Sequence, residues 1–398
     1  MAKTKYRTKI KNGKEYYFFR LRHENLSKPK DIYGTSIKEL DKKIKSAIYE
    51  LENNIQNSKD SFETFLANWL FDVKFINLKP STKERYEGLY RNYIKDSSLS
   101  KVKIKNISLT HIQNYYSELI ENGKSPSCIK MIHKLIAPCI RYAYNNNLLV
   151  RDFTSAIILP KENEEEKLNK VLKVQPFTIR EQKIFINAIK GHELEMLFLT
   201  ALNSGLRQGE LLALTWDDIN FDKCYIQVNK AVKTITDVSK DGRNHTRLLV
   251  QTPKTIKSIR YVAIPTELSK RLEQHKIKQL ELKFKLANLY ENNNLVFCTT
   301  HGKYFDGSNI RKRFNKIIDS INLDKENQIN KIKFHDLRHT YATRLFELGE
   351  NPKTVQELLG HSNVSITLGT YTHVLDNLKF KASSKLNDLY ITMNANQA

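Results

Sequence analysis

Four side chains capable of phosphate chemistry lie in one stretch near the carboxyl end of this sequence. Residues 331–374 hold His335, Arg338, His361 and Tyr371. Arginine offers a charged fork that grips a phosphate in two places, imidazoles can hold or pass protons, and a phenol can attack as a nucleophile. This combination predicts chemistry on a phosphodiester.

The spacing of these residues also leaves a metal site as an alternative. On a helix, His335 and Arg338 share a face and can reach one phosphate, and His339 lies one turn beyond His335. Two histidines at this spacing bind zinc in His-Glu-x-x-His proteases. Here position 336 is Asp336 rather than the glutamate that serves as the base, and Arg338 would place a cation beside the metal. The sequence therefore favours phosphate over zinc, and we expect no metal.

The overall charge also indicates a polyanionic partner. The 398 residues include 66 lysines and arginines against 43 acidic residues, which gives a net charge of +23. Each phosphate that such a protein neutralises releases condensed counterions, so nucleic acid is the expected partner. A soluble basic protein without such a partner is the alternative. The length exceeds one ordinary domain and predicts two or three.

Nothing in the sequence indicates a membrane or secreted protein. It contains no run of about 18 apolar residues, and its start has no apolar secretion segment. We therefore expect no membrane partner and a cytoplasmic location. The cysteines lack Cys-x-x-Cys spacing, which predicts reduced thiols that form neither a zinc site nor a disulfide. They are Cys128, Cys139, Cys224 and Cys298.

Residues 1–58 are predicted to form a small separate module. Residues 1–45 carry fourteen basic side chains against five acidic ones. Aromatic and basic residues mix over 16–22 in a strand-like run after the Asn12–Gly13 turn, and a helix is expected over 36–53. A short sheet with one helix and many cations suits a reader of a DNA groove, and the aromatic residues would also suit a small core. The predicted DNA contacts are Arg20 and Arg22.

Residues 61–160 are predicted to form a helical domain. Apolar side chains recur at helical spacing over 62–70, 81–93, 109–122 and 126–146. Ser81 and Glu84 have the spacing of a helix-capping box. Basic residues beside the apolar stripes would face solvent or DNA. Those predicted to contact DNA are Lys83, Arg85 and Lys130.

The largest domain is predicted to span residues 174–398, after a polar linker over 161–173. Helices are expected over 178–189 and 193–203, with Arg207 soon after the second. Strand-like runs follow at 224–228, 247–251 and 259–264. We expect the last two runs to form a hairpin whose tip presents Lys254 and Lys257.

Five motifs occur in order along this domain. They are Ser204-Gly205-Leu206-Arg207-Gln208-Gly209-Glu210-Leu211, Thr252-Pro253-Lys254, His335-x-x-Arg338-His339-Thr340, Leu359-Gly360-His361 and Thr370-Tyr371-Thr372-His373. Together they resemble the tyrosine recombinases, or phage-type integrases. The layout of the first 160 residues is similar to that of the integrases of phages and conjugative transposons, which join an arm-binding module, a core-binding domain and a catalytic domain.

The resemblance implies a role for each matched residue. The implied roles are Tyr371 as nucleophile, Arg207 and Arg338 as phosphate clamps, Lys254 as general acid, His335 and His361 as hydrogen-bonding or proton-transfer partners, and Glu210 as support for the first arginine. Lys257 is the alternative to Lys254. A phenol with a pKa of about 10 is a weak nucleophile at neutral pH, so nearby cations or an imidazole must assist its ionisation.

The expected fold class is multidomain and mainly α with small β-sheets. It comprises a small α+β arm-binding module, an all-α SAM-like core-binding domain and an α+β catalytic domain with a C-terminal tail. The expected function is site-specific DNA recombination through a 3′-phosphotyrosine, which needs no cofactor because the covalent bond stores the energy of the cut. A DNA-binding regulator with a vestigial site and a type IB-like topoisomerase are the alternatives.

The resemblance also implies partners for this chain. They are double-stranded DNA with core and arm-type sites, further copies of the chain in a tetramer on DNA, and an excisionase or host DNA-bending protein, all at the nucleoid in a bacterial cytoplasm. Apolar residues recur at helical spacing over 375–390. This tail suits packing on a neighbouring protomer or on its own domain.

Overall fold

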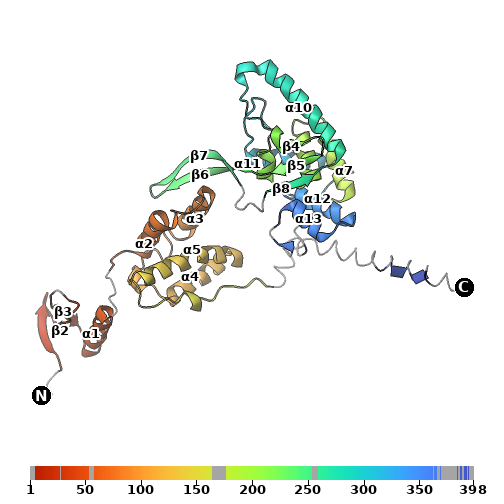
Figure 1. The fold of residues 1–398 in the computed structure, drawn as a ribbon. Coiled ribbons are helices and arrows are strands. Elements are labelled where there is room, and N and C mark those ends of the chain that lie inside the picture. Colours follow the sequence, from red (N-terminus) through yellow and green to blue (C-terminus); the bar gives the residue numbers. More distant parts are fainter. Residues whose placement is uncertain are drawn as a thin grey trace. The chain divides into compact units, whose positions relative to one another are not determined.

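The computed structural model describes residues 5–26, 28–52, 58–163, 176–252 and 259–361, together with 363, 364, 368, 383, 386, 387, 390, 391 and 393. The chain divides into two compact units, of which the first comprises Met1–Glu162 and Thr236–His245 and the second comprises Asn163–Ile235 and Thr246–Ala398. Figure 1 shows the fold and labels most of its elements. The domain limits expected from the sequence stay a prediction, and the expected linker lies largely outside the described residues.

The amino-terminal part of the first unit is a three-stranded antiparallel sheet packed on one helix. Its elements are β1 (Arg7–Lys11), β2 (Lys14–Leu21), β3 (Lys30–Gly34) and α1 (Ile37–Glu52). Asn12 and Gly13 both have positive φ, 52° and 72°, which lets a two-residue turn join β1 to β2. Leu21, Ile32 and Leu40 form the centre of a small buried cluster. The predicted turn, strand and helix are confirmed.

The rest of the first unit is helical around its own apolar core. Its helices are α2 (Phe62–Asn68), which continues as a π-helical turn over Trp69–Lys74, α3 (Pro80–Tyr93), α4 (Leu109–Glu121) and α5 (Pro126–Asn145). Phe62, Leu66 and Leu70 are fully buried in this core, as their helical spacing predicts.

The start of α3 differs from the sequence prediction. Pro80 lies in its first turn, where a missing N–H costs nothing and the fixed φ fits a helix. Ser81 therefore lies inside the helix and caps nothing. Glu84 Oε1 instead accepts a hydrogen bond from the Thr236 amide at 3.2 Å and one from Arg243 at 3.4 Å. The predicted capping box of Ser81 and Glu84 is wrong.

The second unit combines small sheets with helices. Its helices are α7 (Ile179–Ala188), α8 (Glu195–Ser204), α9 (Gln208–Leu212), α10 (Thr266–Leu286), α11 (Gly307–Ile321), α12 (Asp336–Glu347) and α13 (Pro352–Leu359). Thr178 and Glu181 form the capping box of α7. The helices predicted over 178–189 and 193–203 are confirmed. The fold class expected from the sequence, mainly α with small sheets, is confirmed as well.

The strand pairing in this part of the chain corrects one prediction. The strands β4 (Ile219–Asn220), β5 (Tyr225–Val228) and β8 (Arg260–Ala263) form one antiparallel sheet, and β6 (Ala231–Ser239) pairs with β7 (Gly242–Gln251). The runs at 247–251 and 259–264 are strands, but they do not pair with each other. Because β6 was not recognised, the partner of β7 was missing from the prediction. The predicted hairpin tip with Lys254 and Lys257 lies outside the described residues.

Aromatic rings fill the centre of the second unit. Phe185, Phe198 and Phe314 are fully buried, with ring centroids 5.6 to 5.7 Å apart, and Phe334 lies 5.8 Å from Phe314. Such edge-to-face contacts add to the stability gained by burying the rings. This core fixes α7, α8 and α11 against one another.

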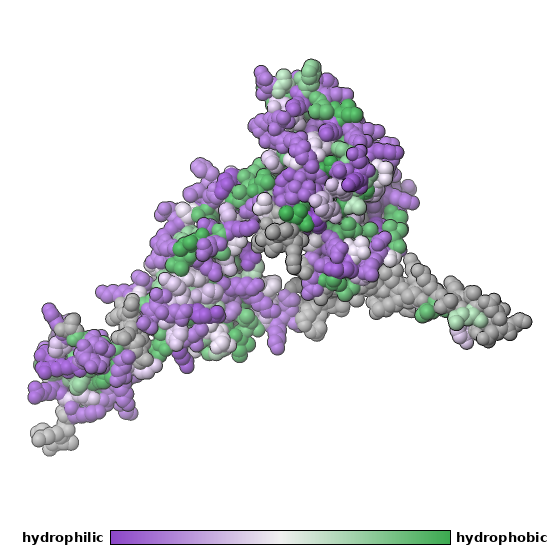
Figure 2. Space-filling model, in the orientation of Figure 1, coloured by the Kyte–Doolittle hydropathy of each residue, from purple (hydrophilic) through white to green (hydrophobic). Residues whose placement is uncertain are grey.

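The surface is mostly polar. Figure 2 shows hydrophilic residues over most of the visible face, with apolar residues in small separate patches. Within the part of the chain that the structure describes, no helix is long and apolar enough to cross a membrane.

Removing one ring from the aromatic core should destabilise the second unit. Phe198→Ala should lower the free energy of unfolding by about 3–5 kcal/mol, because it leaves a cavity among rings that cannot close around it. Phe284→Ala, at a side chain that is 88% exposed on α10, should change it by less than about 0.5 kcal/mol. In a Trp69→Phe background, Trp216 is the single tryptophan, so its fluorescence during urea unfolding reports on this unit alone. Equal stabilities of the two variants would contradict the assigned core.

Candidate active site

The candidate site lies where two helices end and two others begin. Helix α8 ends at Gly205, and Arg207 precedes the first turn of α9, which carries Glu210. His335 precedes α12, which carries Arg338. Helix α13 ends at Gly360, directly before His361. Five of the residues expected from the sequence thus come from helix termini of one unit.

Arg207 is held on two sides. Its Nη1 donates to Glu210 Oε1 at 2.9 Å, and its Nη2 donates to the Gly360 carbonyl oxygen at 3.0 Å. The Arg207 amide also donates to Glu210 Oε2 at 2.9 Å. The Arg207 side chain remains 41% exposed, so the guanidinium is oriented and still open to a ligand.

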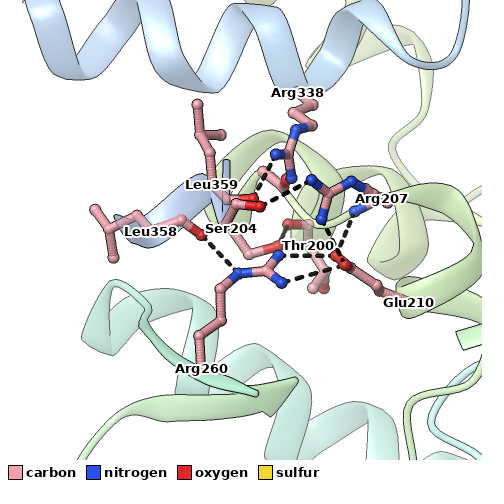
Figure 3. Close-up of polar contacts among 10 residues, drawn as sticks. Thr200, Ser204, Arg207, Glu210, Arg260, Arg338, Leu358 and Leu359 are labelled. Atoms are coloured by element: carbon pink, nitrogen blue, oxygen red, sulfur yellow. Dashed lines mark hydrogen bonds and ion pairs between the residues drawn. The ribbon is translucent and has the colours of Figure 1, made fainter. Parts of the chain in front are cut away.

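Arg338 is buried and held by main-chain oxygens. Its Nη1 donates to the Gly205 carbonyl at 2.7 Å, and its Nη2 donates to the Leu359 carbonyl. Figure 3 shows Arg338, from α12, and Arg207, from the residue before α9, converging on the same turn. Because Leu359 and Gly360 are adjacent, the two guanidinium groups are anchored on successive peptide units.

Both anchoring turns require glycine. Gly205 and Gly360 have φ of 61° and 63°, the left-handed conformation that ends a helix. A Cβ on Gly205 would lie 2.4 Å from Tyr341 Cδ1, so no side chain fits there. The carbonyl ends of helices carry partial negative charge, which favours cations such as these arginines.

Glu210 is a buried carboxylate shared by two arginines. Arg260 on β8 donates from Nη1 to Oε1 at 3.1 Å and from Nη2 to Oε2 at 2.8 Å. Burial acts to raise the pKa of Glu210, but the hydrogen bond and charge of Arg260, with the charge of Arg207, lower it to about 2. The carboxylate is therefore ionised at neutral pH.

Arg260 was missed in the sequence. The signal was present, because β8 alternates between buried and exposed residues and Arg260 falls on the buried side with Val262. An arginine on the apolar side of a strand needs a buried partner. That partner is Glu210.

The histidines of the site are neutral at pH 7. Burial, followed by the charge of Arg338, lowers the pKa of both His335 and His361, and the pKa of His361 falls to about 4. Burial and the neighbouring His335 lower the pKa of His339 to about 4, and the two rings lie edge to face with centroids 5.3 Å apart. Neutral imidazoles can accept a proton or a hydrogen bond.

The charges of this cluster leave a cationic centre. Arg207 and Arg260 pair with one carboxylate, Glu210, while Arg338 is held by carbonyl oxygens. An excess of positive charge in a partly buried site binds an anion such as a phosphate. Among the described residues, no group of three or more His, Cys, Asp or Glu side chains could hold a metal ion.

Two expected site residues lie outside the described residues. They are Tyr371 and Lys254, together with the alternative Lys257 and most of the C-terminal tail. Their roles therefore rest on the sequence motifs.

The predicted DNA contacts lie in the first unit. Lys83 and Arg85 on α3 lie over the rings of Phe75 and Tyr86, at 5.8 and 5.9 Å. Lys130 is exposed on α5, and Arg22 is exposed just after β2. Arg20 forms a two-pronged ion pair with Asp31, at 2.7 and 3.2 Å, which offsets its charge. The sequence did not indicate this pair.

Comparison with known proteins gives a consistent result. Residues 161–377 match the family described as "Phage integrase family", and residues 61–120 match "Phage integrase, N-terminal SAM-like domain". A tyrosine recombinase XerC-like protein of Caldanaerobacter subterraneus subsp. tengcongensis is 39% identical over 392 residues, which cover 96% of this chain and 98% of that protein.

Two solved structures share the fold. One is the Tn1549 transposon integrase in complex with a circular intermediate DNA, with a TM-score of 0.61 and 20% identity, covering 79% of this chain and 95% of that one. The other is a lambda integrase tetramer bound to a Holliday junction, with a TM-score of 0.54 and 17% identity, covering 90% of this chain and 96% of that one.

The neutral histidines should make the stability of the second unit depend on pH. His339 and His361 have a pKa of about 4 in the folded chain, below the value of about 6.5 for an unfolded histidine. Between these values the unfolded chain binds protons that the folded chain excludes. The free energy of unfolding should therefore fall as the pH drops from 6.5 towards 4.

The measurement is urea unfolding at several pH values across this window. The double variant His339→Gln/His361→Gln should show a shallower fall than the wild type. His301→Gln, at an exposed position, controls for the loss of an imidazole. Identical pH slopes for the double variant and the wild type would contradict burial of neutral rings.

Proposed function

This chain belongs to the phage integrase family of tyrosine recombinases, enzymes that cleave and rejoin DNA, and we propose that it integrates and excises a mobile element at specific sites. The single observation that supports this reading best is the pair of guanidinium groups anchored on Leu359 and Gly360, directly before His361. Such a pair can bind both non-bridging oxygens of one phosphodiester. The likeness to a transposon integrase supports a mobile element as the substrate.

Cleavage begins with attack by the Tyr371 hydroxyl oxygen on the scissile phosphorus. A bond forms between Tyr371 Oη and phosphorus, and the bond from phosphorus to the 5′ oxygen breaks, which leaves a 3′-phosphotyrosine. Arg207 and Arg338 neutralise the charge that develops on the pentacoordinate phosphorus. Losing one such donor typically slows catalysis by about 10²–10³-fold.

Two protons must move in this step. The phenol proton passes to an imidazole, that of His335 or His361, since the lowered pKa of each ring leaves it neutral at pH 7. The departing 5′ oxygen receives a proton from Lys254. Rejoining is the reverse reaction, in which a 5′-hydroxyl attacks the phosphotyrosine and releases the phenol, so no external energy source is needed.

The first unit supplies the DNA-binding surfaces in this proposal. The sheet of β1, β2 and β3 reads arm-type sites, with Arg22 better placed than Arg20 because Asp31 already pairs with Arg20. The helical part binds the core site through Lys83, Arg85 and Lys130. Cation contacts with phosphates hold the protein in register, and groove contacts carry the sequence information.

Assembly completes the proposed function. Recombination exchanges strands between two duplexes, and the likeness to a lambda integrase tetramer on a Holliday junction supports four copies on DNA. An excisionase or a host DNA-bending protein directs the reaction. The enzyme acts on the nucleoid in a bacterial cytoplasm.

The first test is covalent trapping by Tyr371. The wild type should form an adduct, resistant to denaturation, with a nicked suicide substrate that carries the element's core site, whereas Tyr371→Phe should bind the same DNA and form none. Tyr261→Phe, which removes an exposed phenol hydroxyl from β8, is the matched control and should trap normally. An adduct in Tyr371→Phe would refute the assignment. Binding without any adduct in the wild type would favour the DNA-binding regulator.

The second test separates Lys254 from Lys257. If Lys254 protonates the leaving oxygen, Lys254→Ala should cleave at least about 100-fold more slowly than wild type, and Lys257→Ala should cleave nearly normally. A substrate with sulfur in place of the bridging 5′ oxygen should restore the rate of Lys254→Ala, because a thiolate leaves without protonation. The measurement is the rate of adduct formation in single turnover. The opposite pattern would assign the proton to Lys257.

A further inference from the structure

Arg260 is a buried arginine that the family motifs of this sequence do not include. Its side chain is 8% exposed, and it lies on β8, six positions after Lys254. A guanidinium stays charged in any protein environment, so a buried one must satisfy its donors with oxygen atoms. Its hydrogen-bond partners, Glu210 and the Leu358 carbonyl, belong to the candidate active site.

One set of its contacts controls Glu210. The fork of Arg260 meets both carboxylate oxygens, at 3.1 and 2.8 Å, and the same two oxygens accept from Nη1 and the amide of Arg207, both at 2.9 Å. Figure 3 shows Glu210 between the two arginines. The plane of the carboxylate, which orients Arg207, is therefore fixed from the other side by Arg260.

A second set of contacts controls the turn at the end of α13. Arg260 Nε donates to the Leu358 carbonyl at 2.9 Å. A Cβ on Gly360 would lie 3.0 Å from both Cδ and Nη1 of Arg260, so the guanidinium packs directly on this turn. The next carbonyls of the turn hold Arg338 and Arg207, and His361 follows.

We propose that Arg260 is a positioning residue for DNA cleavage, which holds Glu210 and the turn at 358–360 so that Arg207 and Arg338 stay aimed at the scissile phosphate. This proposal rests on the phosphate-binding roles proposed for those two arginines. Arg260 acts through Glu210 and Leu358, because Nη1 and Nη2 both pair with the carboxylate and Nε donates to the Leu358 carbonyl. Because Arg260 is the first residue of β8, its ion pair with Glu210 also holds the start of this strand at the candidate site.

The experiment measures the rate of covalent adduct formation in single turnover by the full-length protein. Arg260→Met should cleave about 10–100-fold more slowly than wild type, the usual effect of losing a residue that orients a reacting group, with DNA affinity within about threefold. Arg260→Lys should stay about tenfold or more below wild type, since an ammonium cannot bridge both oxygens of Glu210 and the Leu358 carbonyl. Arg271→Met breaks an arginine–glutamate pair with Glu195 elsewhere in the unit and should cleave normally.

A pH profile separates positioning from a general loss of structure. Without Arg260, buried Glu210 keeps only Arg207 as an ion-pair partner, so its pKa should rise and the rate of Arg260→Met should decline as the pH falls. His335, His361 and Arg338 also face this centre and are the same in Arg260→Met and Glu210→Gln/Arg260→Met. The double variant should lack this added decline, because it has no carboxylate to protonate.

The possible outcomes are distinct. A wild type that forms no adduct would overturn the proposed function and this inference together. An active wild type with folded Arg260→Met and Arg260→Lys variants that cleave at its rate would overturn only the inference. The inference would also be overturned if Arg260→Met cleaves slowly but has the same pH profile as the double variant. If Arg260→Met does not fold, as judged by circular dichroism, Arg260→Lys and Arg260→Gln carry the comparison against the same criteria.

Discussion

The cationic centre depends on guanidinium groups held by peptide oxygens at the carboxyl ends of two helices. The end of α8 holds Arg338, and the end of α13 holds Arg207, Arg260 and Arg338. Carbonyl oxygens carry only partial negative charge, so they satisfy the N–H groups without cancelling the charge. Had carboxylates supplied every acceptor, the centre would be neutral and would attract a phosphate poorly. The backbone acceptors thus hold the arginines rigidly and still leave their positive charge available to a phosphate.

The same charges set the protonation of the neighbouring groups. Cations beside His361 disfavour a second positive charge, in addition to the effect of burial, and so keep the imidazole neutral. They act in the opposite sense on Glu210, whose carboxylate stays ionised although it is buried. A single electrostatic arrangement therefore supplies the anion site, the proton acceptors and the ionised support for Arg207. Removing one member should alter the others, which makes the cluster a coupled unit.

Much of the fold was readable from local signals. The helix capped by Thr178, the Asn12–Gly13 turn and the apolar stripe from Phe62 to Leu70 each depend on neighbours in sequence, and each was predicted. The order of the motifs also identified the family. Pairing of distant strands was not readable, because β6 carries a weak alternation and the partner of β7 depends on the whole sheet. The alternation of β8 could have shown that Arg260 is buried, but its partner could not be predicted, since Glu210 is fifty positions away.

The use of main-chain acceptors has a consequence for how this site can change over time. Every residue type has a main-chain carbonyl. Leu358 and Leu359 can therefore be exchanged for other apolar residues without removing an oxygen that an arginine needs. Gly205 and Gly360 have no such freedom, because the direction of the carbonyls depends on their left-handed backbone. Tolerance to mutation should therefore be sharply uneven along one short turn. Related enzymes should therefore vary in the apolar residues at positions 358 and 359 but keep the glycine at position 360.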